Sequence, residues 1–187
     1  MKEYRTNKEL IEYISSKGVI VSDKEEALKK IERYTYYSIV NTYKSAFKNE
    51  KGKYFNNVSF DEIYALFEFD KELKNIILKY CLEIETVIKA IMANQISQVY
   101  GIKNYLDISN WDASINDTIK INLIDKINAE IEKDYNTHTA VTHYIDKYGF
   151  IPPFVLVKIL TFGVTSRYYG LLKQSDRQAI AKYFQIS

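Results

Sequence analysis

The sequence is poor in residues that interrupt regular structure. Its 187 residues include six glycines and two prolines, too few for a loop-rich β-protein or a low-complexity chain. The single cysteine excludes an internal disulfide. The two histidines, His138 and His143, lie five positions apart, which is not the i, i+4 spacing that places two metal ligands on one helical face. We therefore expect long regular elements, no bound metal and no cofactor.

Long apolar runs and a strong net charge are also absent. No run approaches the roughly 20 apolar residues of a membrane span, and no N-terminal apolar run resembles a signal peptide, so we expect a cytoplasmic protein with no membrane partner. The formal net charge of +2 does not by itself predict nucleic-acid binding. The distribution is more informative, because residues 1–54 hold 12 basic and eight acidic residues interleaved with tyrosines.

The most regular stretch covers residues 60–101. Its apolar side chains recur at i, i+3, i+4 and i+7, which is typical of a helix that buries a broad stripe. We expect one long helix over about residues 70–100, capped by Asp70 and ended by Gly101. Cys81 falls in the stripe, so a buried, unreactive thiol is expected. The stripe consists of Leu73, Ile76, Ile77, Tyr80, Cys81, Ile84, Val87, Ile88, Ile91, Met92, Ile96 and Val99.

The rest of the chain also reads as helical. Four segments fit a capping box, in which a hydroxyl and a carboxylate or amide satisfy each other's backbone N–H groups. They begin at Thr6, Ser22, Ser59 and Ser175. Further helices are expected from the second box towards residue 47, over residues 116–133, from the break at 136–139 to residue 148, and over residues 154–169 and 175–184. Isoleucines 119, 121, 124, 127 and 131 form the expected stripe of the helix at 116–133, and Pro152 and Pro153 can only start a helix. The predicted fold class is all-α, a single helical domain over residues 1–187 built around the long helix.

A basic, tyrosine-rich segment offers candidate RNA contacts. Lysines could neutralise phosphates while tyrosines stack on unpaired bases. The same pattern also fits an amphipathic helix whose tyrosines pack and whose lysines are solvated, and the sequence favours this second interpretation. The RNA-binding candidates are Lys29, Lys30, Arg33, Tyr37 and Lys44.

Glu85 and Lys89 interrupt the edge of the long apolar stripe. They lie at i, i+4 in the favourable order for a helical ion pair. They could be an ordinary surface pair, or a polar pair at the border of the core that faces a groove. Spacing alone favours the surface pair.

Several segments together resemble a known family. They are residues 17–47, residues 58–92 with the FDKEL and IETVIK segments, YGIKNYLD, and the later PPFVLVKILTFGVTSRYYGLL followed by IAKYF. In this order they are similar to the Abi-like (Abi-D/Abi-F type) abortive infection family. The resemblance implies a helical HEPN-type fold, a role in bacterial phage defence, ribonuclease toxin activity and an antitoxin RNA or protein.

The resemblance also identifies residues by position. Glu85 and Lys89 occupy the family's Glu-x-x-x-Arg/Lys positions. The resemblance implies structural roles for Phe69, Asp70, Leu73, Pro152, Phe162 and Gly163.

One family feature is missing. Members typically continue into a helix with an RNxxxH motif, whose Arg and His act on the cut phosphate, but no RNxxxH occurs in these 187 residues. We therefore expect this chain to bind RNA but to be catalytically incomplete. Without the final helix, apolar surface on the long helix would stay uncovered, which predicts a homodimer or higher oligomer. The alternative is a non-enzymatic helical interaction module or scaffold.

Overall fold

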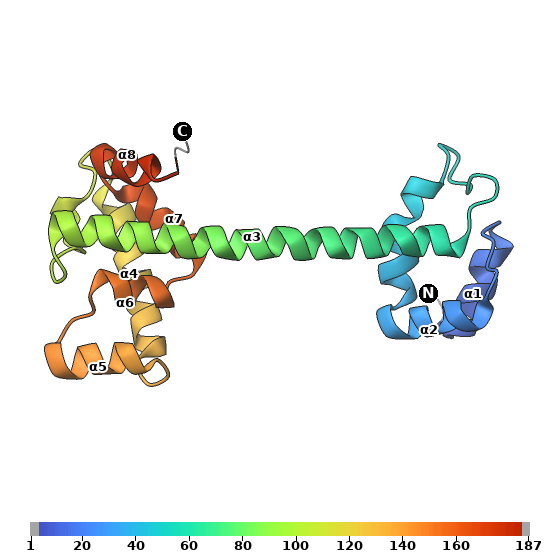
Figure 1. Cartoon of the computed structure of the whole chain (residues 1–187), viewed down its shortest axis with the longest axis horizontal. Coiled ribbons are helices and arrows are strands. Elements are labelled where there is room, and N and C mark those ends of the chain that lie inside the picture. Colours follow the sequence, from blue (N-terminus) through green and yellow to red (C-terminus); the bar gives the residue numbers. More distant parts are fainter. Residues whose placement is uncertain (1–3, 185–187) are drawn as a thin grey trace. The chain divides into compact units, whose positions relative to one another are not determined.

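A computed structural model describes residues 4–184 of the chain. The prediction of an all-α fold is confirmed: the regular elements of this part are helices, supplemented by two isolated backbone bridges. The longest is α3, Phe60–Tyr100, of 41 residues (Figure 1). Within the described residues, no helix combines the length and apolarity needed to cross a membrane.

The chain divides into two compact units, Met1–Lys79 and Tyr80–Ser187. Helix α3 contributes its first part to one unit and its remainder to the other (Figure 1). Each unit has its own buried cluster of apolar side chains. The single domain expected from the sequence stays a prediction.

The first unit packs short helices against the start of α3. They are α1 (Asn7–Ser16), α2 (Lys24–Tyr34), a π-helical turn η1 (Tyr37–Asn41) and a 3-10 turn η2 (Lys44–Phe47). Ile31, Ile39 and Ile63 lie at the centre of the cluster with almost no exposed surface. Ile20 forms two backbone hydrogen bonds with the segment that enters α3. Its N–H donates to the Val58 carbonyl, and its carbonyl accepts from the Phe60 N–H, both at 2.8 Å.

The helix expected to continue towards residue 47 is interrupted, so that prediction is wrong. Helix α2 ends at Thr35, which has a φ of +66°. A β-branched residue rarely adopts this conformation. The Thr35 hydroxyl accepts a hydrogen bond from the backbone N–H of Ser38, at 3.3 Å, and so starts a new turn. Position 35 therefore redirects the chain before the π-helical turn.

Two of the predicted capping boxes are confirmed. Thr6 and Glu9 form the box of α1. Ser59 caps α3: its N–H donates to the Glu62 carboxylate at 2.7 Å, and the Glu62 N–H donates to its hydroxyl at 3.2 Å. Since α3 is continuous from Phe60, the prediction that Asp70 caps a helix starting near residue 70 is wrong. The cap of α2 is Asp23, one residue later than the expected Ser22.

The second unit packs shorter helices against the end of α3. They are η3 (Ile108–Asn110), α4 (Asp117–Asp134), α5 (Thr139–Tyr148), α6 (Pro153–Ile159), α7 (Phe162–Leu171) and α8 (Gln174–Lys182). Helix α4 contacts both α6 and α7. Tyr168 and Trp111 each donate to the backbone carbonyl of Tyr105, at 3.1 and 3.4 Å. These buried rings tie α7 to the loop that follows α3.

Three expectations for this unit are wrong. The helix predicted over residues 154–169 is split, because the chain is extended at Leu160 and Thr161. The stripe predicted for α4 is partly solvent-facing, since Ile119 and Ile121 are half exposed. No capping box starts α8: Lys173 precedes the helix without a side-chain cap, and Asp176 is buried.

The cap of α3 predicts a pH-dependent stability. Hydrogen bonds from the Ser59 backbone and hydroxyl lower the pKa of Glu62 from its ordinary value of 4.5. A lowered folded-state pKa stabilises the protein above the unfolded pKa, and the effect is lost as the pH falls through the folded pKa. Glu62→Gln should therefore lower the urea midpoint at pH 7, and the difference should shrink below pH 4.5. Glu72→Gln, exposed further along α3, is the control. Equal effects of the two variants at all pH values would contradict this role.

Candidate functional site

Lys89 is anchored between two acceptors in the second unit. Its ammonium nitrogen lies 2.6 Å from the Glu85 carboxylate and also donates, at 2.6 Å, to the backbone carbonyl of Leu160. The two side chains are only 15% and 26% exposed. The pair is therefore more than a solvated surface contact, because it connects α3 to the end of α6.

The partner of Lys89 belongs to the turn between α6 and α7. Leu160 ends α6, and the Thr161 hydroxyl caps α7 by accepting from the Val164 N–H at 3.3 Å. Phe162 and Gly163, which follow, are exposed. Gly163 is not a close-packing point, since a Cβ there would meet only the Thr161 hydroxyl, at 4.0 Å. The structure thus brings the IETVIK and TFG segments together, and Lys89 binds a protein acceptor in each of them or directly beside them.

Asp176 forms a second polar centre in this unit. It is 4% exposed and accepts hydrogen bonds from the Tyr100 hydroxyl and from the Gln95 side-chain amide, the latter at 3.1 Å. Burial, together with this hydrogen bond, raises the pKa of Tyr100. Asp176 therefore joins the first turn of α8 to the end of α3. Sequence reasoning missed this role, since a carboxylate at a helix start is normally taken as a cap.

The other residues singled out by the resemblance lie in varied environments. Asp70 pairs with Lys74 at 2.6 Å and accepts from the Tyr43 hydroxyl, and these two groups lower its pKa. Phe69 and Leu73 are 63% and 41% exposed. Pro152 is buried and precedes α6.

The middle of α3 is far more exposed than its stripe predicts. Ile76, Ile77, Tyr80, Ile84 and Val87 are each at least 42% exposed. Cys81 is exposed too, so the prediction of a buried thiol is wrong. The stripe is covered where Ile88, Ile91, Met92 and Ile96 pack on the second cluster. Contiguous apolar surface of this kind is uncommon on a monomer and marks contact sites.

The basic candidates from the sequence separate into two groups. Lys29 and Arg33 are exposed on α2, where Arg33 stacks over the Tyr34 ring. Lys30 pairs with Asp61 at 3.1 Å. Tyr37 and Lys44 instead line a cleft in the first unit.

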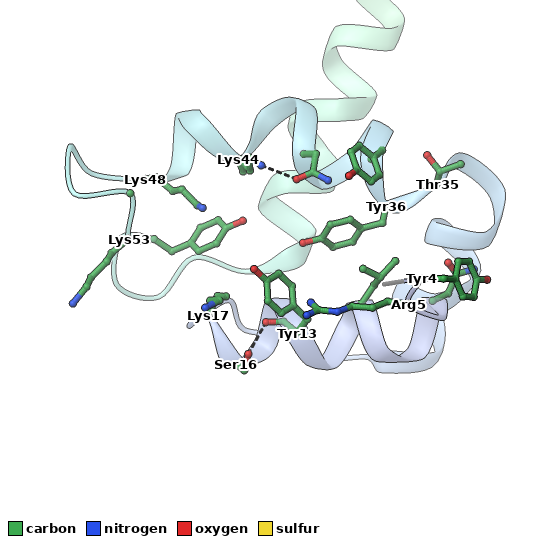
Figure 2. Close-up of a pocket in the computed structure, with 16 residues that line it drawn as sticks. Tyr4, Arg5, Tyr13, Ser16, Lys17, Thr35, Tyr36, Lys44, Lys48 and Lys53 are labelled. Carbon is green, nitrogen blue, oxygen red and sulfur yellow. Dashed lines mark hydrogen bonds between the residues drawn. The ribbon is translucent and has the colours of Figure 1, made fainter. Parts of the chain in front are cut away.

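This cleft collects basic and aromatic side chains from several segments of the first unit (Figure 2). Its volume is about 1310 Å³. Five cations and five tyrosines line it, and none of its lining residues is an aspartate or glutamate. They are Arg5, Lys17, Lys44, Lys48 and Lys53, and Tyr4, Tyr13, Tyr36, Tyr37 and Tyr54.

The basic, tyrosine-rich segment identified in the sequence supplies four of these ten residues, Tyr36, Tyr37, Lys44 and Lys48. Arg5 and Lys17 flank α1, and Lys48 and Lys53 flank a loop, so no helical periodicity relates them. Their proximity depends on the break at Thr35 and on the loop that returns along η2, where Phe55 donates to the Phe47 carbonyl at 3.0 Å. The excess of basic residues in residues 1–54 indicated a positively charged surface, but the sequence could not show whether the basic side chains gather in the cleft or on α2.

The fold and these contacts define an all-α protein in which motif segments distant in sequence meet around Lys89. Residues 29–187 match the family model of the Abi-like proteins. The chain therefore belongs to the Abi-like protein family, which confirms the resemblance. No curated protein and no solved structure matches it significantly. The residues from Tyr4 to Lys17 that line the cleft precede the region matched by the family model.

Lys89 should contribute measurably to stability. Lys89→Ala would leave Glu85 and the Leu160 carbonyl without a partner in a partly buried site, which costs about 1–3 kcal/mol. Lys158→Ala, an exposed lysine on α6, is the matched control and should change stability little. Urea unfolding at neutral pH measures both. If the two variants are equally stable, the anchoring role is wrong.

Proposed function

We propose that this chain is a cytoplasmic HEPN-type abortive infection protein that acts on or binds RNA. Membership of the Abi-like family supports the defence role. The observation that carries the RNA part is the cleft of the first unit, whose lining combines five basic side chains with five tyrosines and holds no acidic residue, a combination suited to phosphates and unpaired bases. An antitoxin RNA or protein is the accompanying partner.

The second part of the proposal is that the chain lacks a complete catalytic site. The 187 residues contain no RNxxxH motif, so they lack the acid–base histidine and phosphate-binding arginine that HEPN ribonucleases use. Glu85 and Lys89 remain as a supporting pair, held against the α6–α7 turn. In this proposal the chain binds RNA without cutting it.

Incubation with total RNA tests this directly. We expect RNA binding that weakens as salt rises and no cleavage, with or without EDTA. Metal-independent cleavage that copurifies with the protein and disappears in Lys89→Ala, but not in Lys158→Ala, would contradict catalytic incompleteness. Complete absence of RNA binding at low salt would contradict the RNA function and favour a non-enzymatic interaction module.

The exposed middle of α3 supports a homodimer or higher oligomer. Ile77 and Ile84 lie seven residues apart, so they project from the same face of the helix, and they are 53% and 52% exposed. Leu73, Ile77, Tyr80, Ile84, Val87 and Ile91 follow the alternating spacing of three and four residues that pairs helices. A second copy of α3 supplies a complementary stripe.

Sedimentation velocity over a range of concentrations tests the oligomer. The native chain should dimerise, and Ile77→Glu/Ile84→Glu should remain monomeric because charge is placed on the paired stripe. Ile119→Glu/Ile121→Glu on α4 is a matched control, since these isoleucines are 55% and 50% exposed. The control should dimerise like the native chain. A native chain that stays monomeric at high concentration would contradict the proposal.

A further inference from the structure

The lining of the cleft in the first unit carries five positive charges and no negative charge. Arg5, Lys17 and Lys48 form no ion pair within the described part of the chain, and their cationic groups lie over aromatic rings. Arg5 also helps to lower the pKa of the Glu9 carboxyl, which lies outside the lining. Lys44 donates to the Asn41 amide oxygen at 2.7 Å and keeps its charge. Cations that converge without carboxylates raise the local positive potential and attract anions. The cleft is therefore chemically suited to a ligand with several negative charges.

Tyrosines alternate with these cations around the cleft. The Tyr13 ring lies 4.4 Å from the Arg5 guanidinium and 5.3 Å from the Lys17 ammonium, and Lys48 lies 4.5 Å from the Tyr54 ring (Figure 2 labels Tyr13 and the three cations). Tyr36 is almost fully buried, which raises its pKa to about 12, so it forms a neutral wall. Tyr37 is 65% exposed and open to a ligand. Flat aromatic faces beside cations stack with bases and leave the cations for the phosphates.

The volume of the cleft helps to distinguish between possible ligands. The cleft's 1310 Å³ exceeds the roughly 300–1,000 Å³ typical of pockets that enclose one small molecule. A phosphate ion or a single nucleotide would reach only some of the five cations. An acidic protein segment would use the charges but not the row of tyrosines. A flexible strand with repeating phosphates and bases uses both.

Local structure holds the cleft open from several sides. The turn after Thr35 presents Tyr36 and Tyr37, and the Tyr37 carbonyl accepts from the Thr42 hydroxyl at 3.1 Å. On the opposite side, the Asn49 side chain accepts from the N–H groups of Lys51 and Lys53 at 3.0 and 3.1 Å. This loop positions Lys48 and Tyr54. Positive φ at a β-branched residue and π-helical turns both concentrate at functional sites.

From these observations we propose that the cleft is the binding site for an unpaired RNA strand, with the phosphates on Arg5, Lys17, Lys44 and Lys48 and the bases on the tyrosines. The site rests on the proposed RNA function and deepens it, because it locates the contact in the first unit. It differs from the α2 surface of Lys29 and Arg33, two of the RNA-binding candidates named from the sequence.

Fluorescence anisotropy with a labelled 12-nucleotide single strand and a paired hairpin of equal length tests the site. Arg5→Glu/Lys17→Glu/Lys48→Glu removes three cleft cations, whereas Lys24→Glu/Lys29→Glu/Arg33→Glu makes the same charge change on α2. The cleft variant should bind at least about tenfold more weakly, and its slope of log affinity against log salt should fall by about two. The α2 variant should retain most of the native affinity.

A second pair of variants tests stacking and does not depend on the triple variant folding. Tyr37→Ala should weaken single-strand binding about tenfold. Tyr183→Ala, which removes a tyrosine of equal exposure, 66%, in the second unit, should not. Far-UV circular dichroism checks folding of all four variants.

The outcomes separate the cleft from the general RNA function. Native protein that binds neither RNA overturns the RNA function and the cleft with it. If the native protein binds RNA, and the triple cleft variant and Tyr37→Ala bind it equally well, the cleft is not the binding site but the RNA function stands. Equal affinity for single strand and hairpin overturns the preference for unpaired RNA. The proposal stands if only the cleft variants lose affinity for the single strand.

Discussion

The continuous helix α3 constrains everything else in the chain. A 41-residue helix presents far more apolar surface than the shorter helices cover. Burial is confined to two stretches, around Phe60 and Ile63 in the first unit and around Met92 and Ile96 in the second. The apolar residues between these two stretches therefore stay exposed. They are the physical reason for proposing a homodimer, since fully burying an exposed apolar side chain of this size is worth about 1.5–3 kcal/mol.

The two units use charge differently. In the second unit, Lys89 and Asp176 form hydrogen bonds with protein partners. Lys89 thereby connects α3 to the end of α6, and Asp176 connects α8 to α3. In the first unit, the cations of the cleft face rings and solvent. Charges satisfied within the fold stabilise it, whereas charges left uncompensated in a concave site remain available for a ligand. This contrast is the reason for proposing RNA contact in the first unit and a supporting role for the Glu85–Lys89 pair.

The sequence predicted what depends on local periodicity and end signals. The all-α class, the boxes at Thr6 and Ser59, α4 and the end of α5 at Tyr148 are confirmed in this way. It failed where tertiary contacts override local preference. Asp176 resembles a cap but is buried and accepts from Tyr100, and Cys81 lies in the exposed part of the apolar stripe. The cleft was predictable only in part, because its residues come together through a strained turn at Thr35 and a loop.

Photo-crosslinking tests whether RNA lies in the cleft of the first unit. A single-stranded RNA carrying 4-thiouridine is bound to the native chain, irradiated, and the crosslinked peptides are identified by mass spectrometry. We expect crosslinks on the peptides that contain Tyr13, Tyr37 and Tyr54, in the cleft. Crosslinks confined to peptides from α4 to α8, or to the α2 surface around Lys29, would contradict it.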